Sequence, residues 1–312
     1  QRWTTGKGLT AKKAIRLANQ MGVAMYDAFI GKASAAVLQR VTPTAVLLDV
    51  DETILNLPWE LLFSGDAPLV MKYPFGRLVT TRTLPRAGRD PIEEDTSLRI
   101  LAVVNPTDDL ASSERELIRL KEVAETYPGL VKLDVLTHDQ ATLAAFRNAL
   151  DGQDYDILHF TGHAQLDTTS PGESGLYLTD GRLSADDVMN LGWAKPPYVI
   201  FNNACESGRA VAGRRLVDGE KHSNGLASAF LTCGVYAYIG YFWPVSDPGA
   251  ALFSETFYRQ LFETQNVGIA FLHARQRTAQ VLLASGDLTG LQAILIGDAA
   301  SAHRRDLATM AK

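Results

Sequence analysis

The sequence has little cysteine and no long hydrophobic segment. Its 312 residues include two cysteines, Cys205 and Cys233, which cannot form a disulfide framework or a multi-cysteine zinc site. No apolar run reaches the roughly 18 residues that a membrane-spanning helix needs, and no secretory signal is visible. These absences favour a cytoplasmic protein without a membrane segment. The chain starts at Gln1 rather than Met, so we expect a fragment of a longer protein.

The chain also lacks a strong excess of charge of either sign. Its formal net charge is -5 at pH 7, and a mildly acidic balance argues against direct, electrostatically driven binding of nucleic acid. Hydrophobic residues make up 46% and charged residues 21%, which excludes a disordered or fibrous protein. The length corresponds to about two domains or one large one.

A polar segment divides the chain into two parts. Residues 11–40 carry apolar side chains three and four residues apart, which predicts a helix. Residues 67–84 are rich in β-branched and aromatic residues and predict strands or a hairpin. The segment 86–96 is polar and contains Gly and Pro. It predicts a boundary between an N-terminal helix and small-sheet subdomain, residues 1–95, and a larger domain, residues 96–312.

In the larger domain, apolar strands alternate with amphipathic helices. We predict strands at 98–105, 130–136, 154–160, 196–204, 235–242 and 293–298, and helices at 112–127, 142–150, 224–231, 249–264 and 266–285. Ser112 or Ser113 is predicted to cap the first of these helices. The alternation predicts an α/β fold with a mainly parallel sheet that helices cover on both faces.

Two of the predicted strands end in residues that can do chemistry. His163 follows strand 154–160, and Cys205 follows strand 196–204. Ligands of open α/β sheets bind beyond the carboxyl ends of strands, so neighbouring strands would bring these residues together. A thiolate is a nucleophile, and a nearby imidazole can take its proton and protonate a leaving amine. The amides of Gly162 and Cys205 could form an oxyanion hole. A buried, unreactive cysteine is the alternative.

The motifs around these residues resemble those of a known family. HFTGHAQLD, VIFNNACESG and GYFWPVSD occur in the order and spacing of the CHAT domain, a caspase-like cysteine peptidase related to separase. The resemblance is strongest over 154–298, and LPWELL at 57–62 and LRILAVVNP at 98–106 resemble the upstream part of the family. It implies a caspase-like α/β/α sandwich and hydrolysis of a protein substrate, with no metal or organic cofactor.

The resemblance also implies roles for single residues in the catalytic step. Cys205 would be the nucleophile and His163 the general acid or base, and both family positions are filled here. His159 alternates into the sheet layers and is interpreted as structural. Cys233 is surrounded by apolar residues and is predicted to be a buried structural thiol.

Other residues are expected to bind the substrate. Asp247 stands where separase-like relatives have the aspartate of a specificity pocket, which implies cleavage after Arg or Lys, although some CHAT proteins cut after non-basic residues. Asp247 equally fits the cap of a helix that starts near Pro248. Glu206 either adds negative potential beside the nucleophile or lies on a solvated rim. Trp243 forms a pocket wall or simply packs.

Bacterial CHAT proteins are commonly joined to repeat or sensor domains, and several act in antiphage defence, switched on by CRISPR RNA-guided effectors or cyclic nucleotides. The resemblance therefore implies a signal-gated protease with a sensor or activator at its N-terminal side. Helix 11–40 could be the docking element, and ordinary core packing is the alternative. Segment 207–224 is interpreted as a mobile loop that must order for activity, with Arg209, Arg214 and Arg215 as candidate self-cleavage sites. A solvated insertion without a role is the alternative.

Two other functions stay open at this point. A caspase-like fold can serve as an interaction module without catalysis. The segment LLDVDETIL at 47–55 matches the aspartate loop of haloacid-dehalogenase-type phosphatases, in which Asp49 would attack phosphorus and Asp51 would act as the acid, with magnesium between carboxylates. The other interpretation of this segment is an acidic turn at a strand end.

Overall fold

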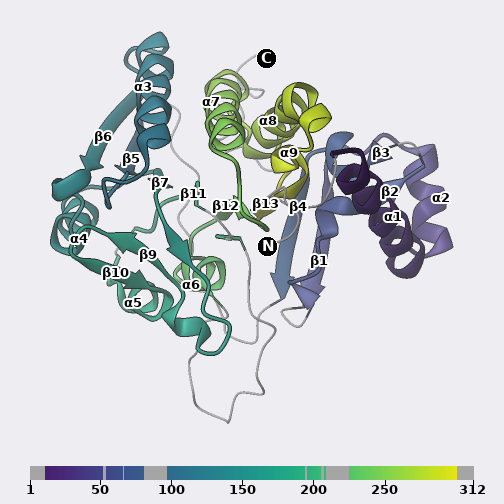
Figure 1. Cartoon of the computed structure of the whole chain (residues 1–312), viewed down its shortest axis with the longest axis horizontal. Coiled ribbons are helices and arrows are strands. Elements are labelled where there is room, and N and C mark those ends of the chain that lie inside the picture. The colour runs from purple at the N-terminus through teal and green to yellow at the C-terminus, as the bar shows by residue number, and fades with distance from the viewer. Residues whose placement is uncertain are drawn as a thin grey trace, which may run out of the picture.

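An eight-stranded sheet runs through the molecule (Figure 1). The computed structural model describes residues 11–51, 54–65, 67–80, 97–193, 195–204, 207–208 and 225–300. The strands follow one another across the sheet in the order β1 (Val46–Asp51), β4 (Phe75–Thr80), β13 (Ala293–Ile296), β12 (Ala237–Tyr241), β11 (Val199–Asn202), β7 (Ile157–Thr161), β5 (Leu98–Val104) and β6 (Val131–Thr137). Neighbouring strands are parallel except for the antiparallel pair β12–β13. The predicted mainly parallel sheet is therefore confirmed.

The one antiparallel pair decides which strand ends meet. Strands β13, β4 and β1 run opposite to the other five. The carboxyl ends of β5, β7, β11 and β12 therefore lie together at one edge of the sheet, and the carboxyl end of β1 lies at the opposite edge. Chemistry carried by β7 and β11 is thus separated from the acidic segment on β1.

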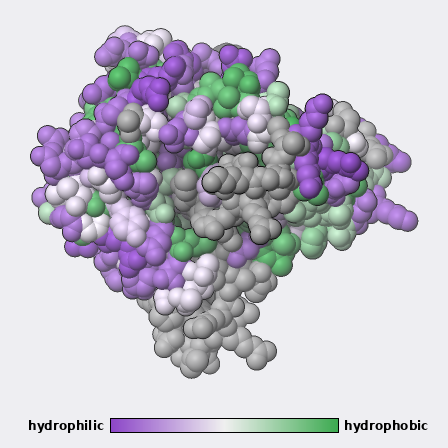
Figure 2. Space-filling view, viewed as in Figure 1, coloured by the Kyte–Doolittle hydropathy of each residue, from purple (hydrophilic) through white to green (hydrophobic). Residues whose placement is uncertain are grey.

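Helices cover both faces of the sheet, as predicted. One face packs against α3 (Ala111–Thr126), α7 (Asp247–Thr264) and α8 (Val267–Leu282). The other packs against α4 (Leu143–Gly152), α5 (Ala185–Asn190) and α6 (Leu226–Thr232). On the outside, hydrophilic side chains gather over α3, α4 and α5 (Figure 2). The α/β/α sandwich explains why the central strands are continuous apolar runs, since both of their faces are buried.

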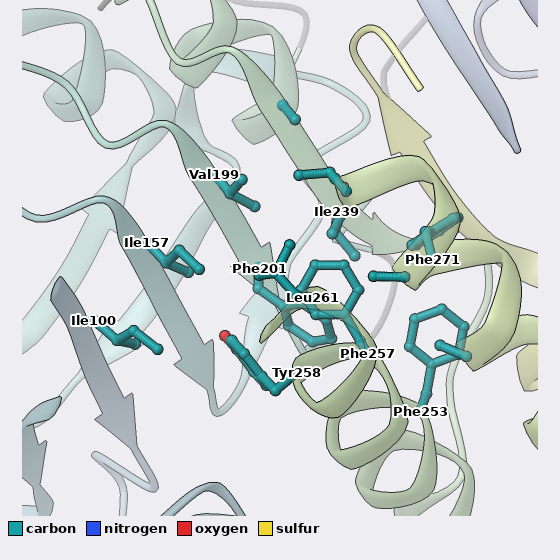
Figure 3. Close-up of a cluster of buried hydrophobic side chains, with 14 of the residues drawn as sticks. Ile100, Ile157, Val199, Phe201, Ile239, Phe253, Phe257, Tyr258, Leu261 and Phe271 are labelled. Atoms are coloured by element: carbon teal, nitrogen blue, oxygen red, sulfur yellow. The ribbon is translucent and has the colours of Figure 1, made fainter. Parts of the chain in front are cut away.

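Aromatic side chains fill the layer between the sheet and α7. Phe201 on β11 lies 5.1 Å from Phe257 and 5.6 Å from Tyr258, measured between ring centroids (Figure 3). All three are at most 1% exposed. Truncating one such ring costs about 3–5 kcal/mol, because the close-packed layer cannot collapse into the space. This layer fixes α7 against the strands that carry the predicted site.

The N-terminal region differs from its prediction. The single helix expected at 11–40 is wrong: α1 (Ala11–Phe29) and α2 (Lys32–Arg40) are separate helices that meet at a bend of 116°. Gly31 caps α2 in an extended conformation, and the low helix propensity of glycine explains why the helix breaks here. Among the described residues, no single helix has the length and hydropathy of a membrane span, and α1 and α2 reach that threshold only when counted together.

Strands β1 and β4 link this region to the rest of the fold. They pack with η2 (Trp59–Leu61) around a core that includes Met25, Val50 and Leu62. Because β4 pairs with β13, residues from both sides of the predicted boundary share one sheet. The segment that would contain the boundary, 81–96, lies outside the described residues, and the division at residue 95 stays a prediction.

Candidate active site

The ends of β7 and β11 lie side by side. The two strands pair in parallel, with Asn202 opposite Phe160, and the backbone N–H of Asn203 donates to the Phe160 carbonyl at 2.7 Å. The segment after β7, which carries His163, therefore emerges beside the segment after β11, which leads to Cys205. This is the adjacency that the sequence predicted. Cys205 itself lies outside the described residues, as does Glu206, so the dyad stays a prediction.

The residues on both sides of position 205 are firmly held. Ala204 is 2% exposed and Ser207 is 2% exposed. The Ser207 hydroxyl donates to the carbonyl of Asn202 at 2.9 Å and accepts from the N–H of Tyr241 at 3.2 Å. The N–H of Gly208 donates to the Tyr241 carbonyl at 3.0 Å. Both flanks are thus fixed to β11 and β12 at the carboxyl edge of the sheet.

His163 is oriented by a carboxylate that the sequence analysis missed. Its Nε2 lies 3.0 Å from Oδ2 of Asp109, and its side chain is 45% exposed. The Thr107 hydroxyl donates to Asp109 at 2.5 Å. The hydrogen bonds from Thr107 and from His163 lower the pKa of the Asp109 carboxyl below its ordinary value. Nε2 of His163 is therefore engaged by Asp109, and Nδ1 is the nitrogen that does not contact this carboxylate.

Asp109 lies in the loop between β5 and α3, which has an unusual backbone. Asn105 and Asp108 have φ angles of 50° and 54°, values that are uncommon for residues other than glycine and that Asn and Asp adopt more often than most. Asn105 Oδ1 accepts from the N–H of Leu110 at 3.0 Å. This bond satisfies the start of α3, so the predicted cap by Ser112 or Ser113 is wrong; Ser113 is buried inside the helix.

A second histidine, His138, also contacts this loop and the first turn of α3. His138 Nε2 lies 2.7 Å from Glu114 Oε1 and 3.5 Å from Asp108 Oδ1. The hydrogen bond to Glu114, followed by the negative charges around the ring, raises the pKa of His138 above its ordinary value. The loop that orients His163 is therefore tied to a histidine whose pKa the fold raises.

Gly162 is required by the space around it. A Cβ atom there would lie 2.7 Å from Cζ of the buried Phe160 ring, closer than real Cβ atoms come, and 3.1 Å from Cδ of Pro106, which is a tight contact. A residue with a side chain would therefore force the backbone at position 162 away from Phe160, at the end of β7. The predicted oxyanion role of the Gly162 and Cys205 amides depends on this closeness and stays a prediction.

The two predicted pocket residues follow β12 at the same edge. The N–H of Trp243 donates to Gln292 Oε1 at 3.0 Å, and Gln292 Nε2 donates to the Pro244 carbonyl at 3.1 Å, which makes the turn rigid. Asp247 is the exposed first residue of α7. Ser246 caps this helix through the N–H of Gly249, so the alternative that Asp247 is the cap is wrong. The substrate-binding roles of Trp243, Asp247 and Glu206 stay predictions.

Other predicted residues lie as expected or away from the site. His159 is fully buried inside the sheet layers, and Cys233 is 4% exposed with its thiol directed to the Val188 carbonyl at 3.2 Å; both structural predictions are confirmed. Asp49 lies inside β1 rather than in a turn, and Asp51 ends that strand at the edge opposite His163.

Segment 209–224, with the proposed self-cleavage arginines, lies outside the described residues. No group of three or more His, Cys, Asp or Glu is close enough to hold a metal ion within the described ranges.

Known structures share this architecture. Gingipain R, an Arg-specific cysteine proteinase, superimposes with a TM-score of 0.59 at 14% identity, over 91% of this chain and 68% of that one. The complex of the pro- and mature gingipain domains from Porphyromonas gingivalis gives 0.57 at 13% identity, over 91% and 69%. Separase from Saccharomyces cerevisiae, in complex with securin, gives 0.51 at 14% identity, over 81% of this chain but only 16% of the separase chain. The fold is that of the caspase-like cysteine proteases.

The sequence places the chain more narrowly. The family model of the CHAT domain matches residues 19–284, so the chain belongs to the CHAT domain family. No curated protein sequence matches it. The family model begins inside α1 and includes β1 and β4, so it spans the predicted boundary at residue 95.

Proposed function

We propose that this chain is a cysteine endopeptidase whose catalytic pair is His163 and Cys205. The observation that carries the proposal is the adjacency of the β7 and β11 ends, with Asn203 hydrogen bonded to Phe160 between them. A caspase-like fold with His163 oriented by Asp109 supports it further. An interaction module would have no need of an imidazole held in this way.

The proposed reaction uses only the chain's own groups and water. Nδ1 of His163 takes the proton of the Cys205 thiol, and the thiolate attacks the carbonyl carbon of the scissile bond. The amides of Gly162 and Cys205 stabilise the oxyanion. The imidazolium, held by Asp109, protonates the leaving amine, and water then hydrolyses the thioester.

We further propose cleavage after Arg, with Lys as the second choice. Asp247 supplies an exposed carboxylate at the edge where β7 and β11 end, and a carboxylate binds a guanidinium through two parallel hydrogen bonds. Gingipain R, which has the same fold, is described as Arg-specific. Trp243 would form the wall of this pocket and Glu206 would add negative potential.

The proposed activity is gated by a signal, as the family resemblance implies. A CRISPR-type or cyclic-nucleotide sensor on the N-terminal side would act through α1. This is supported by a small cluster in which Ala18 of α1 packs with Leu61 and Leu291, and Trp243 contacts the same cluster. An activator bound to α1 would thus act one layer away from the proposed pocket.

The test compares the chain with its Cys205→Ala variant on a proteome-derived peptide library, with new termini mapped by mass spectrometry. We expect cysteine-dependent cuts after Arg or Lys, and loss of this preference in Asp247→Asn. Cuts after other residues would keep the mechanism and overturn the pocket. Cys233→Ala is the matched control and keeps full activity. If there is no cleavage, and an electrophilic peptide fails to label Cys205, the chain is an interaction module.

A further inference from the structure

A charged side chain and an imidazole are buried directly behind the candidate active site, and the proposed reaction uses neither. Glu116 on α3 is 4% exposed and His159 on β7 is 0% exposed. Oε1 of Glu116 lies 3.2 Å from Nε2 of His159 and accepts from Nδ2 of Asn203 at 2.6 Å. A carboxylate is removed from water only where such partners compensate it. The contact to Asn203 reaches the segment that leads to Cys205.

His159 connects this carboxylate to two further elements. Its Nδ1 lies 2.9 Å from the hydroxyl of Tyr258 on α7, and its Nε2 lies 2.8 Å from the Thr161 hydroxyl at the end of β7. Burial, followed by the charge of Glu116, raises the pKa of Tyr258 well above its ordinary value, so this hydroxyl keeps its proton. The ring stacks on Phe201 at 5.2 Å. The histidine is thus fixed on both nitrogens and on one face.

Asn203 is held from two sides but has an incomplete set of hydrogen bonds. Its backbone N–H is bound to Phe160, and its Nδ2 is bound to Glu116. A carboxylate accepts only, so it fixes the amide with nitrogen toward α3 and Oδ1 away from it. That Oδ1 is buried and has no hydrogen-bond partner among the described residues. A buried acceptor without a partner calls for an explanation, and a role at a functional site is one of them.

We propose that Asn203 is a positioning residue for the Cys205 nucleophile and that the Glu116–His159 pair sets its orientation. This inference rests on the proposed function. Glu116 binds Asn203, two residues before the nucleophile, and contacts His159, four residues before His163. One carboxylate, carried by α3, therefore contacts both of the strands that lead to the dyad, and Tyr258 on α7 holds the histidine of this pair.

Glu116→Gln tests the proposal, because a glutamine carries no charge and has one acceptor oxygen where the carboxylate has two. We expect kcat to fall at least 10-fold while KM changes less than 3-fold. We also expect a shift in the pH midpoint of Cys205 alkylation by iodoacetamide, followed at that residue by peptide mapping. Glu60→Gln is the matched control: Glu60 is 1% exposed and paired with Arg77 on β4, not with a residue of β7 or β11. It should lose stability but keep kcat and the alkylation midpoint.

A double variant separates positioning from a general loss of stability. Asn203→Ala alone should lower kcat about as much as Glu116→Gln. If the two residues act as one unit, kcat of the double variant stays within 3-fold of kcat of the less active single variant. Fully multiplicative losses would overturn the proposal. Tyr258→Phe, which removes only the hydroxyl on His159, is a milder change if Glu116→Gln does not fold, and should lower kcat a few-fold at unchanged KM.

The failure of this inference differs from the failure of the proposed function. If the unmodified chain cleaves but Glu116→Gln loses no more kcat than Glu60→Gln, the protease stands and the positioning role is overturned. If the unmodified chain does not cleave, the rate and pH midpoint of Cys205 alkylation still decide the matter. Values in Glu116→Gln equal to those of the unmodified chain would overturn the positioning role.

Discussion

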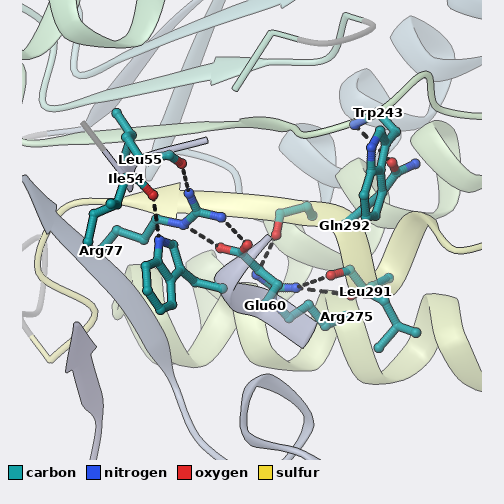
Figure 4. Close-up of polar contacts among 11 residues, drawn as sticks. Ile54, Leu55, Glu60, Arg77, Trp243, Arg275, Leu291 and Gln292 are labelled. Carbon is teal, nitrogen blue, oxygen red and sulfur yellow. Dashed lines mark hydrogen bonds and ion pairs between the residues drawn. The ribbon is translucent and has the colours of Figure 1, made fainter. Parts of the chain in front are cut away.

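Among the residues that the structure describes, two ion pairs are buried on both sides, and they differ in what surrounds them. In the N-terminal region, Arg77 on β4 donates from Nε to Glu60 at 2.9 Å and through a second nitrogen to the other carboxylate oxygen. Its third nitrogen donates to the carbonyl of Leu55 at 2.7 Å (Figure 4). Arg275, also buried, bonds backbone carbonyls nearby, including that of Gly290 at 3.1 Å. All the nitrogens of Arg77 therefore have acceptors.

The second pair, Glu116 and His159, lies behind the candidate active site and is less complete. It contacts an asparagine with an orphan oxygen, and it contains an imidazole in place of a guanidinium. Of the four described non-glycine residues with positive φ, three lie in the loops beside His163: Asn105, Asp108 and His138. The comparison teaches that one pair joins a segment to the sheet, whereas the other lies beside loops whose backbone is in an uncommon conformation, which is typical of functional sites.

The largest effect is expected when the N-terminal pair is broken. Glu60→Ala leaves the Arg77 guanidinium buried without its partner, which should cost about 3–5 kcal/mol in the free energy of unfolding. Urea denaturation measures this loss. Glu173→Ala is the control, because Glu173 pairs with Arg182 at the surface and should cost less than about 1 kcal/mol. Equal losses in both variants would mean that the buried pair has no special role in stability.

The active-site carboxylate should show the opposite behaviour. Asp109→Ala frees the His163 imidazole from its orienting partner and should lower kcat/KM about 100-fold. Because Asp109 is exposed, the free energy of unfolding should change by less than about 0.5 kcal/mol. Steady-state kinetics and urea denaturation on the same samples check both values. Asp139→Ala, a nearby acid that makes no contact with His163 among the described residues, should leave kcat/KM unchanged; a loss equal to that of Asp109→Ala would contradict the orienting role.

A smaller, pH-dependent effect is expected in the loop that holds Asp109. The folded state raises the pKa of His138, so the stabilising contact with Glu114 is fully present below the ordinary histidine pKa of 6.5. It is lost as the pH rises through the raised value. Hydrogen exchange of residues 105–110 should therefore be slower at pH 6 than at pH 9, after correction for the intrinsic rate. In His138→Gln this difference should disappear; if it persists, another group controls the loop.

Local patterns were enough to predict most of the fold. The strands were found because buried parallel strands are continuous apolar runs, and the glycine and the polar residues at their ends marked His163 and the position of Cys205. The helix ends were less predictable. The break after Phe29 depends on one glycine, and the start of α3 is satisfied by Asn105, which lies outside the helix and was hidden from a search for a serine cap.

The polar contacts of the site could not be predicted in the same way. Asp109 and His163 are 54 residues apart in sequence, and Asn203 and Glu116 are 87 residues apart. Such pairs meet only once the order of β5, β7 and β11 across the sheet is known. One signal was available: Asp108 and Asp109 follow the end of β5, as His163 follows the end of β7, so the segments after neighbouring strands could have been searched for an acid.

The smallest effect on stability is expected at residues with positive φ, and it compares a helix end with the loop between β5 and α3. Gln265, which ends α7, is the fourth described residue with positive φ, at 52°, and a glycine there adopts this conformation without strain. Gln265→Gly should raise the free energy of unfolding by about 0.5–1 kcal/mol and leave cleavage unchanged. Asp108→Gly relieves the same kind of strain at 54° but loses the contact to His138. It should therefore gain less stability and lower kcat/KM a few-fold. Equal gains, with activity kept in both, would show that the loop beside His163 is no more constrained than an ordinary helix end.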